Sequence, residues 1–352
     1  MEEEKMEKAW RKVKLKSDVL FRGNLTSLPW LMVIIAFFLV LSVSPGAVYA
    51  GTLTLGHTVP PSHVWHKTAE KFAANLDTMS NGKMKLKVVP LSKLGNEPQM
   101  FSMVQSGAIA FTVLPAAFVA NREESLLGWF LPYLFQDVQQ AGDAVVLPSS
   151  QKMLKNLETH NVVGVGYMFA GMRHVLSVNE VKSPADLVNK KIRAFPSPIF
   201  NDWWQANGAA PTALPLAEIA PSLTTNLLDA VDVDLDIIVG LKYHQQAKYL
   251  ALTNHMAFPA VLIASKKWWD SLSPEDQAIV NKAFLEAEVY GIDLQVKAEV
   301  SNLEKLKADG AVVTEIDLGT FKEKAKQVRE KYINQNELIK QFADEVEKNI
   351  KQ

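Results

Sequence analysis

The sequence contains no cysteine among its 352 residues. Disulfide bonds, thiolate metal sites, cysteine nucleophiles and lipid attachment through an N-terminal cysteine are therefore excluded. An excess of charge of one sign is also missing, because 37 lysines and arginines balance 38 aspartates and glutamates. No Lys/Arg-rich run follows the N-terminal region, so we expect no nucleic-acid partner.

Signatures of nucleotide chemistry and of hydrolases are absent as well. The chain has no G-x-x-x-x-G-K-[ST], no G-x-G-x-x-G after a strand and no G-x-S-x-G turn. What remains is a normal globular composition, with 48% hydrophobic and 21% charged residues. We therefore expect no enzyme activity. The alternative is an exported enzyme that uses Asp232, Asp234 or Asp236 as an acid or base.

The N-terminal segment predicts export. Residues 1–24 are rich in charge, and an apolar run of roughly 16 residues follows at 28–43, whereas a membrane-spanning helix needs about 20. Val48 and Ala50 suit a signal peptidase, so we predict a signal peptide over 1–50 that is cleaved after Ala50. An uncleaved anchor is the alternative. Both place the remaining chain outside the cytoplasm, in the periplasm.

Beyond residue 50, the apolar pattern alternates between strand and helix periods. Residues 52–55 and 83–88 alternate as strands do, and residues 65–76 between them repeat at helical spacing. A long helical pattern begins near Ser273, with Ser273 as N-cap and Pro274 in the first turn. Strands that alternate with helices indicate an α/β fold with mainly parallel sheets.

Three aspartates alternate with apolar residues near the middle of the chain. Asp232, Asp234 and Asp236 would share one face of a strand that we predict over 230–238. Two interpretations remain open. The segment is either a strand end turned to solvent, or the acidic edge of a cleft that orients an arginine, accepts from ligand hydroxyls or holds a divalent cation.

His63 and His66 are three residues apart and could share a helix face. A zinc site needs about three protein ligands, and no H-E-x-x-H motif accompanies the pair. We therefore expect both to be surface or cleft-mouth residues and expect neither metal nor cofactor. The alternative is a divalent cation that bridges the ligand, with Asp234 and Asp236 as its protein ligands.

Arg173 and Arg193 are the main candidates for binding a ligand. Each follows or lies within an apolar, strand-like segment, where a charged side chain is costly unless it is paired. The guanidinium group matches a carboxylate in two parallel hydrogen bonds, which lysine cannot reproduce. The alternative is pairing with an internal aspartate or glutamate.

At these residues the chain resembles the substrate-binding subunits of tripartite ATP-independent periplasmic (TRAP) transporters, of the DctP type. The resemblance covers residues 51 to about 333. It rests on the order and spacing of several motifs: Leu55-Gly56-His57, Asn81-Gly82-Lys83, the segment 90–97, Leu131-Pro132-Tyr133, Lys190-Lys191-Ile192-Arg193, Gly208 to Thr212 and the segment 247–255.

The resemblance implies a two-lobed, periplasmic-binding-protein-like fold (type II-like), with lobes joined by crossing strands and a long helix. Lobe I would comprise 51–171 plus 258–297, and lobe II 172–257 plus 298–352. Arg193 matches the arginine that grips the ligand carboxylate, and Arg173 matches a second arginine. An asparagine that often contacts the ligand is replaced by Val233, and Asp234 or Asp236 could substitute for it.

The rest of the pocket is expected from polar and aromatic residues that could equally belong to the core: His57, Thr58, Trp65, Phe169, Phe195, Trp203 and Asp236. Pro115 stands where sugar-acid binders carry a glutamate, so the organic acid is left open. The resemblance implies capture of a small carboxylate by hinge closure and delivery to a membrane permease. A ligand-sensing protein of the same fold is the alternative.

Overall fold

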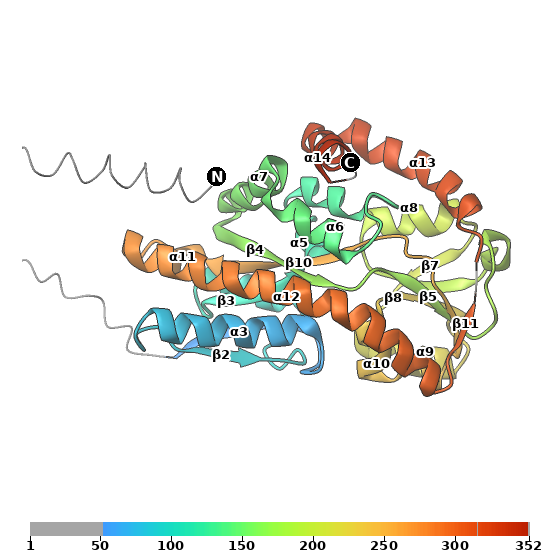
Figure 1. Cartoon of the computed structure of the whole chain (residues 1–352), viewed down its shortest axis with the longest axis horizontal. Coiled ribbons are helices and arrows are strands. Elements are labelled where there is room, and N and C mark those ends of the chain that lie inside the picture. Colours follow the sequence, from blue (N-terminus) through green and yellow to red (C-terminus); the bar gives the residue numbers. More distant parts are fainter. Residues whose placement is uncertain (1–51, 315, 351–352) are drawn as a thin grey trace, which may run out of the picture. The chain divides into compact units, whose positions relative to one another are not determined.

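A computed structural model of the chain describes residues 52–314 and 316–350 (Figure 1). The predicted signal peptide lies outside the described residues. These residues form one compact unit that contains two β-sheets. None of the helices in this part of the chain is both long and apolar enough to cross a membrane.

The first sheet has the strand order β2-β1-β3-β10-β4. β1 pairs in parallel with β2 and β3, and β10 runs antiparallel between β3 and β4. β3 and β10 are buried along their whole length, which explains their unbroken apolar sequences. The bounds are β1 Leu53–Gly56, β2 Leu86–Val89, β3 Phe111–Pro115, β4 Val162–Ala170 and β10 Phe258–Ser265.

The second sheet has the strand order β11-β9-β5-β8-β6-β7. Its bounds are β5 His174–Ser177, β6 Lys191–Ala194, β7 Ala210–Ala213, β8 Ala230–Val233, β9 Tyr249–Ala251 and β11 Val312–Thr314. Among the described strands, five of the nine pairings are parallel. The four antiparallel pairings involve β5 and β10, the strands that the chain enters directly after it passes from one sheet to the other.

Two short segments carry the chain between the sheets. Residues 171–173 connect β4 to β5, and residues 252–257 connect β9 back to β10. The segments are hydrogen-bonded to each other, since the Arg173 amide donates to the Met256 carbonyl (2.8 Å) and the His255 amide donates to the Arg173 carbonyl (3.2 Å). The predicted two-lobed α/β fold with crossing strands is thus confirmed.

The long helix is α12, Pro274–Ala308. It packs against α3, β4 and α6 along one part of its length and against α10 further on, so it joins the surroundings of both sheets. The Ser273 side chain accepts from the Asp276 amide (3.1 Å), and Pro274 occupies the first turn. The predicted start of this helix is confirmed.

Shorter helices surround the two sheets. Around the first sheet lie α3 Val64–Met79, α4 Glu97–Ser106, α5 Ala116–Val119, η1 Glu124–Phe130, α6 Val138–Asp143, η2 Ala144–Val146, α7 Pro148–Asn156, η3 Leu157–His160 and α11 Lys266–Trp269. Around the second lie η4 Pro184–Leu187, α8 Pro198–Ala206, η5 Leu216–Glu218, α9 Ile219–Thr224, α10 Leu235–Leu241 and η6 Tyr243–Gln245.

The C-terminal helices are α13, Leu318–Gln335, and α14, Glu337–Asn349. α13 packs on α8, whereas α14 packs on η1 and α7, which follow the first sheet's strand β3 in the chain. The chain therefore returns at its end to the neighbourhood of the first sheet (Figure 1). The residue limits of the two lobes stay a prediction.

The strand that we expected over 230–238 is wrong beyond Val233. β8 ends there, and α10 begins at Leu235 with Asp234 as its N-cap. The Asp234 carboxylate accepts from the Ile237 amide (3.0 Å), which satisfies one of the free amides of the first turn. The three aspartates therefore do not share one strand face.

Candidate functional site

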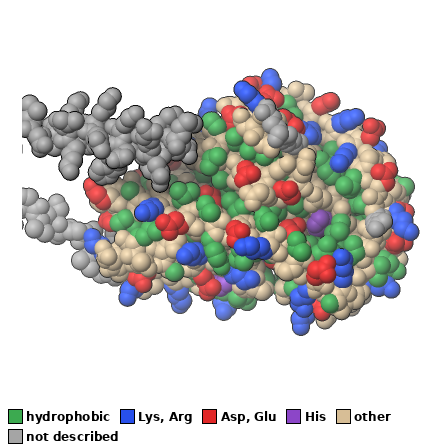
Figure 2. Space-filling view, viewed as in Figure 1, with side chains coloured by type: hydrophobic (Ala, Val, Ile, Leu, Met, Phe, Trp, Pro, Cys, Tyr) green, Lys and Arg blue, Asp and Glu red, His purple; other side chains and the backbone are tan. Residues whose placement is uncertain are grey.

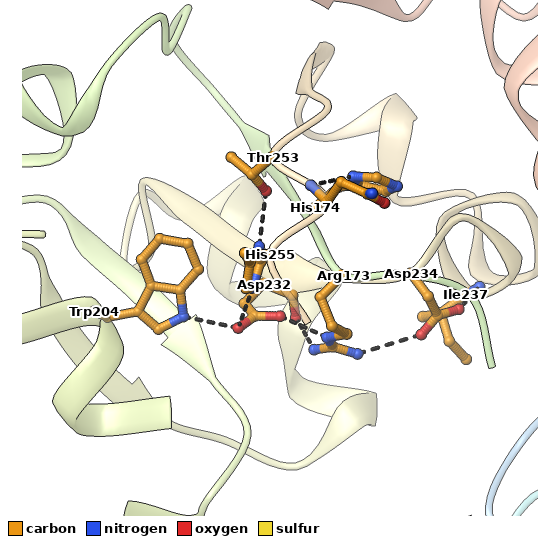
Figure 3. A network of polar contacts seen from close by, with 9 residues as sticks. Arg173, His174, Trp204, Asp232, Asp234, Ile237, Thr253 and His255 are labelled. Atoms are coloured by element: carbon orange, nitrogen blue, oxygen red, sulfur yellow. Dashed lines mark hydrogen bonds and ion pairs between the residues drawn. The ribbon is translucent and has the colours of Figure 1, made fainter. Parts of the chain in front are cut away.

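Arg173 lies in the first crossing segment and is 3% exposed. β5 and β8 pair antiparallel with His174 opposite Val233, which brings Arg173 beside two aspartates. Its Nε donates to Asp232 Oδ1 (2.6 Å), and its Nη1 donates to Asp234 Oδ2 (3.3 Å). A third bond joins Nη2 to the Asp232 carbonyl (Figure 3). Arg173 is thus already neutralised inside the protein.

Asp232 is the centre of this network and is fully buried. Its Oδ2 accepts from Trp204 Nε1 (2.7 Å) and lies 3.4 Å from His255 Nε2 (Figure 3). Burial raises the pKa of Asp232, but Arg173 and His255 outweigh burial and hold the pKa well below its ordinary value. Asp232 is therefore a permanent anion whose main role is to hold Arg173.

An aromatic group surrounds Arg173. Its guanidinium lies 4.3 Å from the centre of the Phe258 ring, a cation–π distance. Trp65 stacks on Phe258 with centroids 6.0 Å apart, and Phe195 meets the same ring edge-on at 5.4 Å. The structure thus brings the predicted residues Trp65 and Phe195 together with Arg173, around a phenylalanine that the sequence analysis missed.

Arg193 differs from Arg173 in its partners. It lies in β6, is 5% exposed, and its Nε and Nη2 both donate to the Leu214 carbonyl (3.1 and 3.0 Å). Among the described residues, no carboxylate forms an ion pair with it. Burial lowers the pKa of Arg193 to about 10, and the charge of Arg173 acts in the same direction. Within the described part of the chain, Arg193 is thus a buried cation without a counter-ion of its own.

The other two aspartates lie at the start of α10. Burial raises the pKa of Asp234, although His63 and Arg173 counteract it. Asp236 is 7% exposed, and its Oδ1 accepts from Asn302 Nδ2 of α12 (2.9 Å). Its Oδ2 is buried and has no hydrogen-bond partner, so this oxygen is free to accept a hydrogen bond.

His63 and His66 are buried, with exposures of 1% and 7%, so the surface alternative of the prediction is wrong. His63 is the N-cap of α3, where its Nδ1 accepts from the Trp65 amide (3.0 Å). Together with Asp234 and Asp236 it offers ligand atoms that all lie within 4.8 Å of one another. However, a neutral histidine that accepts at Nδ1 carries its proton on Nε2. The group that faces Asp234 at 3.9 Å is therefore a donor, which does not suit a metal ligand.

His57 and Thr58 follow β1. His57 is fully buried, and its Nε2 lies 2.9 Å from His66 Nδ1, while Thr58 is half-buried. Burial lowers the pKa of His57 to about 3, helped by His66 and His63. His57 is thus neutral, and its Nδ1 is buried without a partner.

Two further predicted pocket residues pack against other aromatic rings. The Phe169 ring packs on Trp129 (5.6 Å), inside an aromatic cluster. Trp203 stacks on His255 (5.7 Å) and meets Tyr133 edge-on. Its neighbour Trp204 is the one that reaches Asp232. The sequence analysis named Trp203 and not Trp204 for the pocket.

The first crossing segment also contacts α12. A Cβ on Gly171 would lie 2.0 Å from Glu299 Oε1, so any larger residue here would have to displace the Glu299 carboxyl. The Glu299 carboxyl also accepts from Gln295 Nε2 (3.0 Å). Burial raises the pKa of Glu299 to about 8, and the charges of Asp234 and Asp236 add to the rise. Glu299 is therefore largely protonated near neutral pH.

Glu299→Gln is expected to reduce the loss of stability as pH rises from about 4.5 to about 8. The unfolded carboxyl titrates near 4.5 and the folded one near 8, so across this window only the folded protein holds the proton. Stability therefore falls as the pH rises through this window and levels off above the folded pKa. The total loss is at most about 1.4 kcal/mol per unit of pKa difference. Glutamine mimics the protonated carboxyl and should abolish this contribution.

Urea unfolding at several pH values would test this expectation. The variant should match the parent protein near pH 4.5 and exceed it in stability at pH 8. Glu304→Gln, at an exposed position on the same helix, is the matched control and should leave the pH profile unchanged. Parallel profiles for Glu299→Gln and the parent protein would contradict the assigned shift.

Two mixed sheets, two crossing segments, a long bridging helix and a buried arginine at the crossing are the features of a two-lobed solute-binding protein. Comparison with protein families gives the same result. The model of the bacterial extracellular solute-binding proteins of family 7 (DctP) matches residues 55–336. The chain belongs to this family, which confirms the resemblance drawn from the sequence motifs.

Individual relatives agree with the family. An uncharacterised protein of Haemophilus influenzae is 30% identical, over 83% of this chain and 88% of its own. The 2,3-diketo-L-gulonate-binding periplasmic protein YiaO of Escherichia coli is 28% identical, over 82% of this chain and 89% of its own. A TRAP periplasmic solute-binding protein of Bradyrhizobium, solved with galacturonate, is 28% identical with a TM-score of 0.79, over 84% of this chain and all of that one.

Proposed function

We propose that this protein captures a small organic acid outside the cytoplasmic membrane and that Arg193 binds the carboxylate. The observation that carries this proposal is the state of Arg193, a guanidinium 5% exposed whose Nε and Nη2 donate to one carbonyl oxygen. A buried charge is costly unless it is paired. An incoming carboxylate would supply the missing charge and a bidentate partner.

Arg173 has a different role in this account. Asp232 and Asp234 already occupy its Nε and Nη1. A ligand carboxylate at Arg173 would have to displace one of these carboxylates or lie beside it, at a cost in electrostatic repulsion. Arg173 therefore positions the acidic and aromatic groups around the site.

The ligands of the relatives support the proposal that this protein binds an organic acid. 2,3-diketo-L-gulonate and galacturonate, which the relatives from Escherichia coli and Bradyrhizobium bind, are both sugar-derived carboxylates. The free Oδ2 of Asp236 offers an acceptor for a ligand hydroxyl, and Trp65, Phe195 and Phe258 offer apolar surface. The ligand class is thus a small carboxylate that also bears hydroxyl or keto groups.

We propose binding without turnover and without a metal or other cofactor. Two groups that could serve in catalysis or metal binding have partners within the protein, since Asp232 is bonded to Arg173 and the His63 ring to the Trp65 amide. The loaded protein would then deliver its ligand to the membrane permease of a TRAP transporter. Closure of the lobes over the ligand excludes water and strengthens the carboxylate–guanidinium contact.

A thermal-shift screen of residues 51–352 against organic acids tests this function. A ligand that binds only the folded state raises the melting temperature in a concentration-dependent way. Each acid is paired with its neutral analogue, for example galacturonate with galactose, and each pair is run with calcium and with EDTA. The expected result is a rise with the acid alone, equal in both buffers. A neutral analogue that works equally well, or a rise that EDTA abolishes, would contradict the proposal.

A further inference from the structure

One cavity of about 810 Å³ in the described part of the chain lies outside the site around Arg173 and Arg193, which we call the carboxylate site. Its walls come from the helix α13, from the segment between η1 and α6 and from the second crossing segment. Pockets that bind small organic molecules have volumes of about 300–1,000 Å³. We call this cavity the α13 pocket. One side is a face of α13 between Leu318 and Ile333, and the other side is formed by Pro132, Tyr133, Phe135, Gln136 and Asn254.

The α13 side of the pocket is cationic. Lys322, Lys326 and Arg329 line it, and their spacing of four and then three residues places them on one face of the helix. Among the described residues that line the pocket, Glu330 is the single carboxylate. Figure 2 shows lysine and arginine side chains, together with acidic ones, on the surface over α13. The excess of positive charge favours a ligand that carries more than one negative charge.

The three cations are available to such a ligand. Lys322 forms no ion pair with any of the described residues. Lys326 is paired with Glu323 at 3.3 Å, and both side chains are 73% exposed. Arg329 Nη2 lies 2.9 Å from Glu347 Oε1, and the Glu347 side chain is 46% exposed. Because exposed ion pairs contribute little to stability, a ligand anion can compete with these two glutamates.

The opposite side of the pocket is mostly apolar. Pro132, Phe135 and the Tyr133 ring form it, and Lys322 Nζ lies 5.9 Å from the centre of the Tyr133 ring. The Tyr133 hydroxyl is buried and has no hydrogen-bond partner among the described residues. A buried donor without an acceptor is costly, and an anionic oxygen in the pocket would supply the acceptor. The pocket thus combines cations, an apolar wall and one unpaired hydroxyl donor.

Two lining residues have a left-handed backbone conformation. Tyr133 has a φ of 57° and Asn254 a φ of 48°, and a bulky residue such as tyrosine rarely adopts this conformation. The Tyr133 amide donates to the His255 carbonyl (2.8 Å), and the Asn254 side chain donates to the Gln136 carbonyl, so the loop is held on the crossing segment. Backbone strain of this kind occurs preferentially at functional sites. The Leu131-Pro132-Tyr133 motif has no part in the carboxylate site, and the α13 pocket gives it one.

We propose that the α13 pocket is a second ligand site, which binds a small organic anion with an apolar or aromatic body and about two negative charges. The negative group meets Lys322, Lys326 and Arg329, and the body lies on Pro132 and Phe135. An aryl phosphate has this chemistry, because its phosphate carries about 1.5 to 2 negative charges at pH 7. No residue of the carboxylate site lines the pocket, so this proposal does not depend on the binding of an organic acid at Arg193.

Titration calorimetry of residues 51–352 with 1-naphthyl phosphate tests the ligand class. 1-Naphthol supplies the aromatic body alone, and inorganic phosphate supplies the charge alone. We expect 1-naphthyl phosphate to bind at least about tenfold more tightly than either, because only this probe makes both kinds of contact. A protein that does not bind 1-naphthyl phosphate, or that binds one of the two partial probes equally well, would overturn the proposal.

Substitutions locate the bound probe. Lys322→Glu should weaken the binding of 1-naphthyl phosphate at least about tenfold, because an attractive charge becomes a repulsive one. Lys324→Glu is the matched control, at an exposed position of the same helix outside the pocket, and Arg193→Met is the control for the carboxylate site. Both should leave the affinity within about twofold at 0.15 M salt. Equal losses in the two lysine variants, or a loss confined to Arg193→Met, would overturn the proposal.

The Tyr133 hydroxyl can be tested alone. Tyr133→Phe removes the donor and keeps the ring on the pocket wall. The affinity for 1-naphthyl phosphate should fall about tenfold, as expected for the loss of a hydrogen bond to a charged group, while the weaker affinity for 1-naphthol stays the same. An unchanged affinity for 1-naphthyl phosphate would contradict the placement of its charged group in this pocket.

Discussion

Asp232→Ala is expected to lower the free energy of unfolding by about 3–5 kcal/mol, the cost of removing one partner of a buried ion pair. The substitution leaves Arg173, which is 3% exposed, without its principal counter-ion. It also removes the acceptor of Trp204 Nε1. Urea unfolding at neutral pH would measure the change.

Two further variants make this expectation specific. Asp232→Asn keeps the shape of the side chain and removes its charge, so it should still destabilise the protein clearly even if the alanine variant does not fold. Asp270→Ala breaks only the exposed ion pair with Lys266 and should cost at most about 1 kcal/mol. If Asp232→Asn cost no more than Asp270→Ala, the pair with Arg173 would not be the buried centre described above.

Arg193→Met is expected to weaken binding of the organic acid by about 2–5 kcal/mol while leaving the stability of the ligand-free protein equal or higher. The two effects diverge because no described carboxylate pairs with Arg193, whereas the bound acid would depend on it. Methionine retains much of the apolar stem. Titration calorimetry with the acid found by screening, together with urea unfolding, would measure both.

The control for this substitution is another partly buried arginine that lies over an aromatic ring. Arg122→Met removes a guanidinium 3.8 Å from the centre of the Phe101 ring and should leave the affinity for the acid unchanged. Equal losses of affinity in the two variants would indicate a general effect of charge. A large loss of stability in Arg193→Met would show that Arg193 is structural.

Much of the fold follows from local pattern. The alternation of strand and helix periods and the Ser273-Pro274 start of α12 depend on residues close in sequence, and the structure confirms them. The antiparallel pairings of β5 and β10 were not predicted, because they depend on where the chain crosses between the sheets.

The two arginines stand out in the sequence because charged residues are rare in apolar strands. The sequence does not show that the two arginines differ in their partners. The partner of Arg173 is 59 residues away, and the contact depends on the register of β5 with β8. Phe258, 85 positions beyond Arg173, reaches it in the same way, through the second crossing segment.

Helix N-caps explain two differences between the predictions and the structure at the site. The alternation of aspartates with apolar residues placed Asp234 in a strand, yet its carboxylate caps α10. We expected His63 at the surface or at the mouth of the cleft, yet its ring caps α3 and is buried. A side chain that satisfies a free backbone amide can be buried where its polarity alone predicts exposure.

A crystal structure of the complex with the acid identified by screening tests the central claim most directly. The account predicts a ligand carboxylate within about 2.7–3.2 Å of the Arg193 guanidinium nitrogens, with Arg173 still bonded to Asp232. A carboxylate bound to Arg173, with Arg193 still donating only to the Leu214 carbonyl, would contradict it.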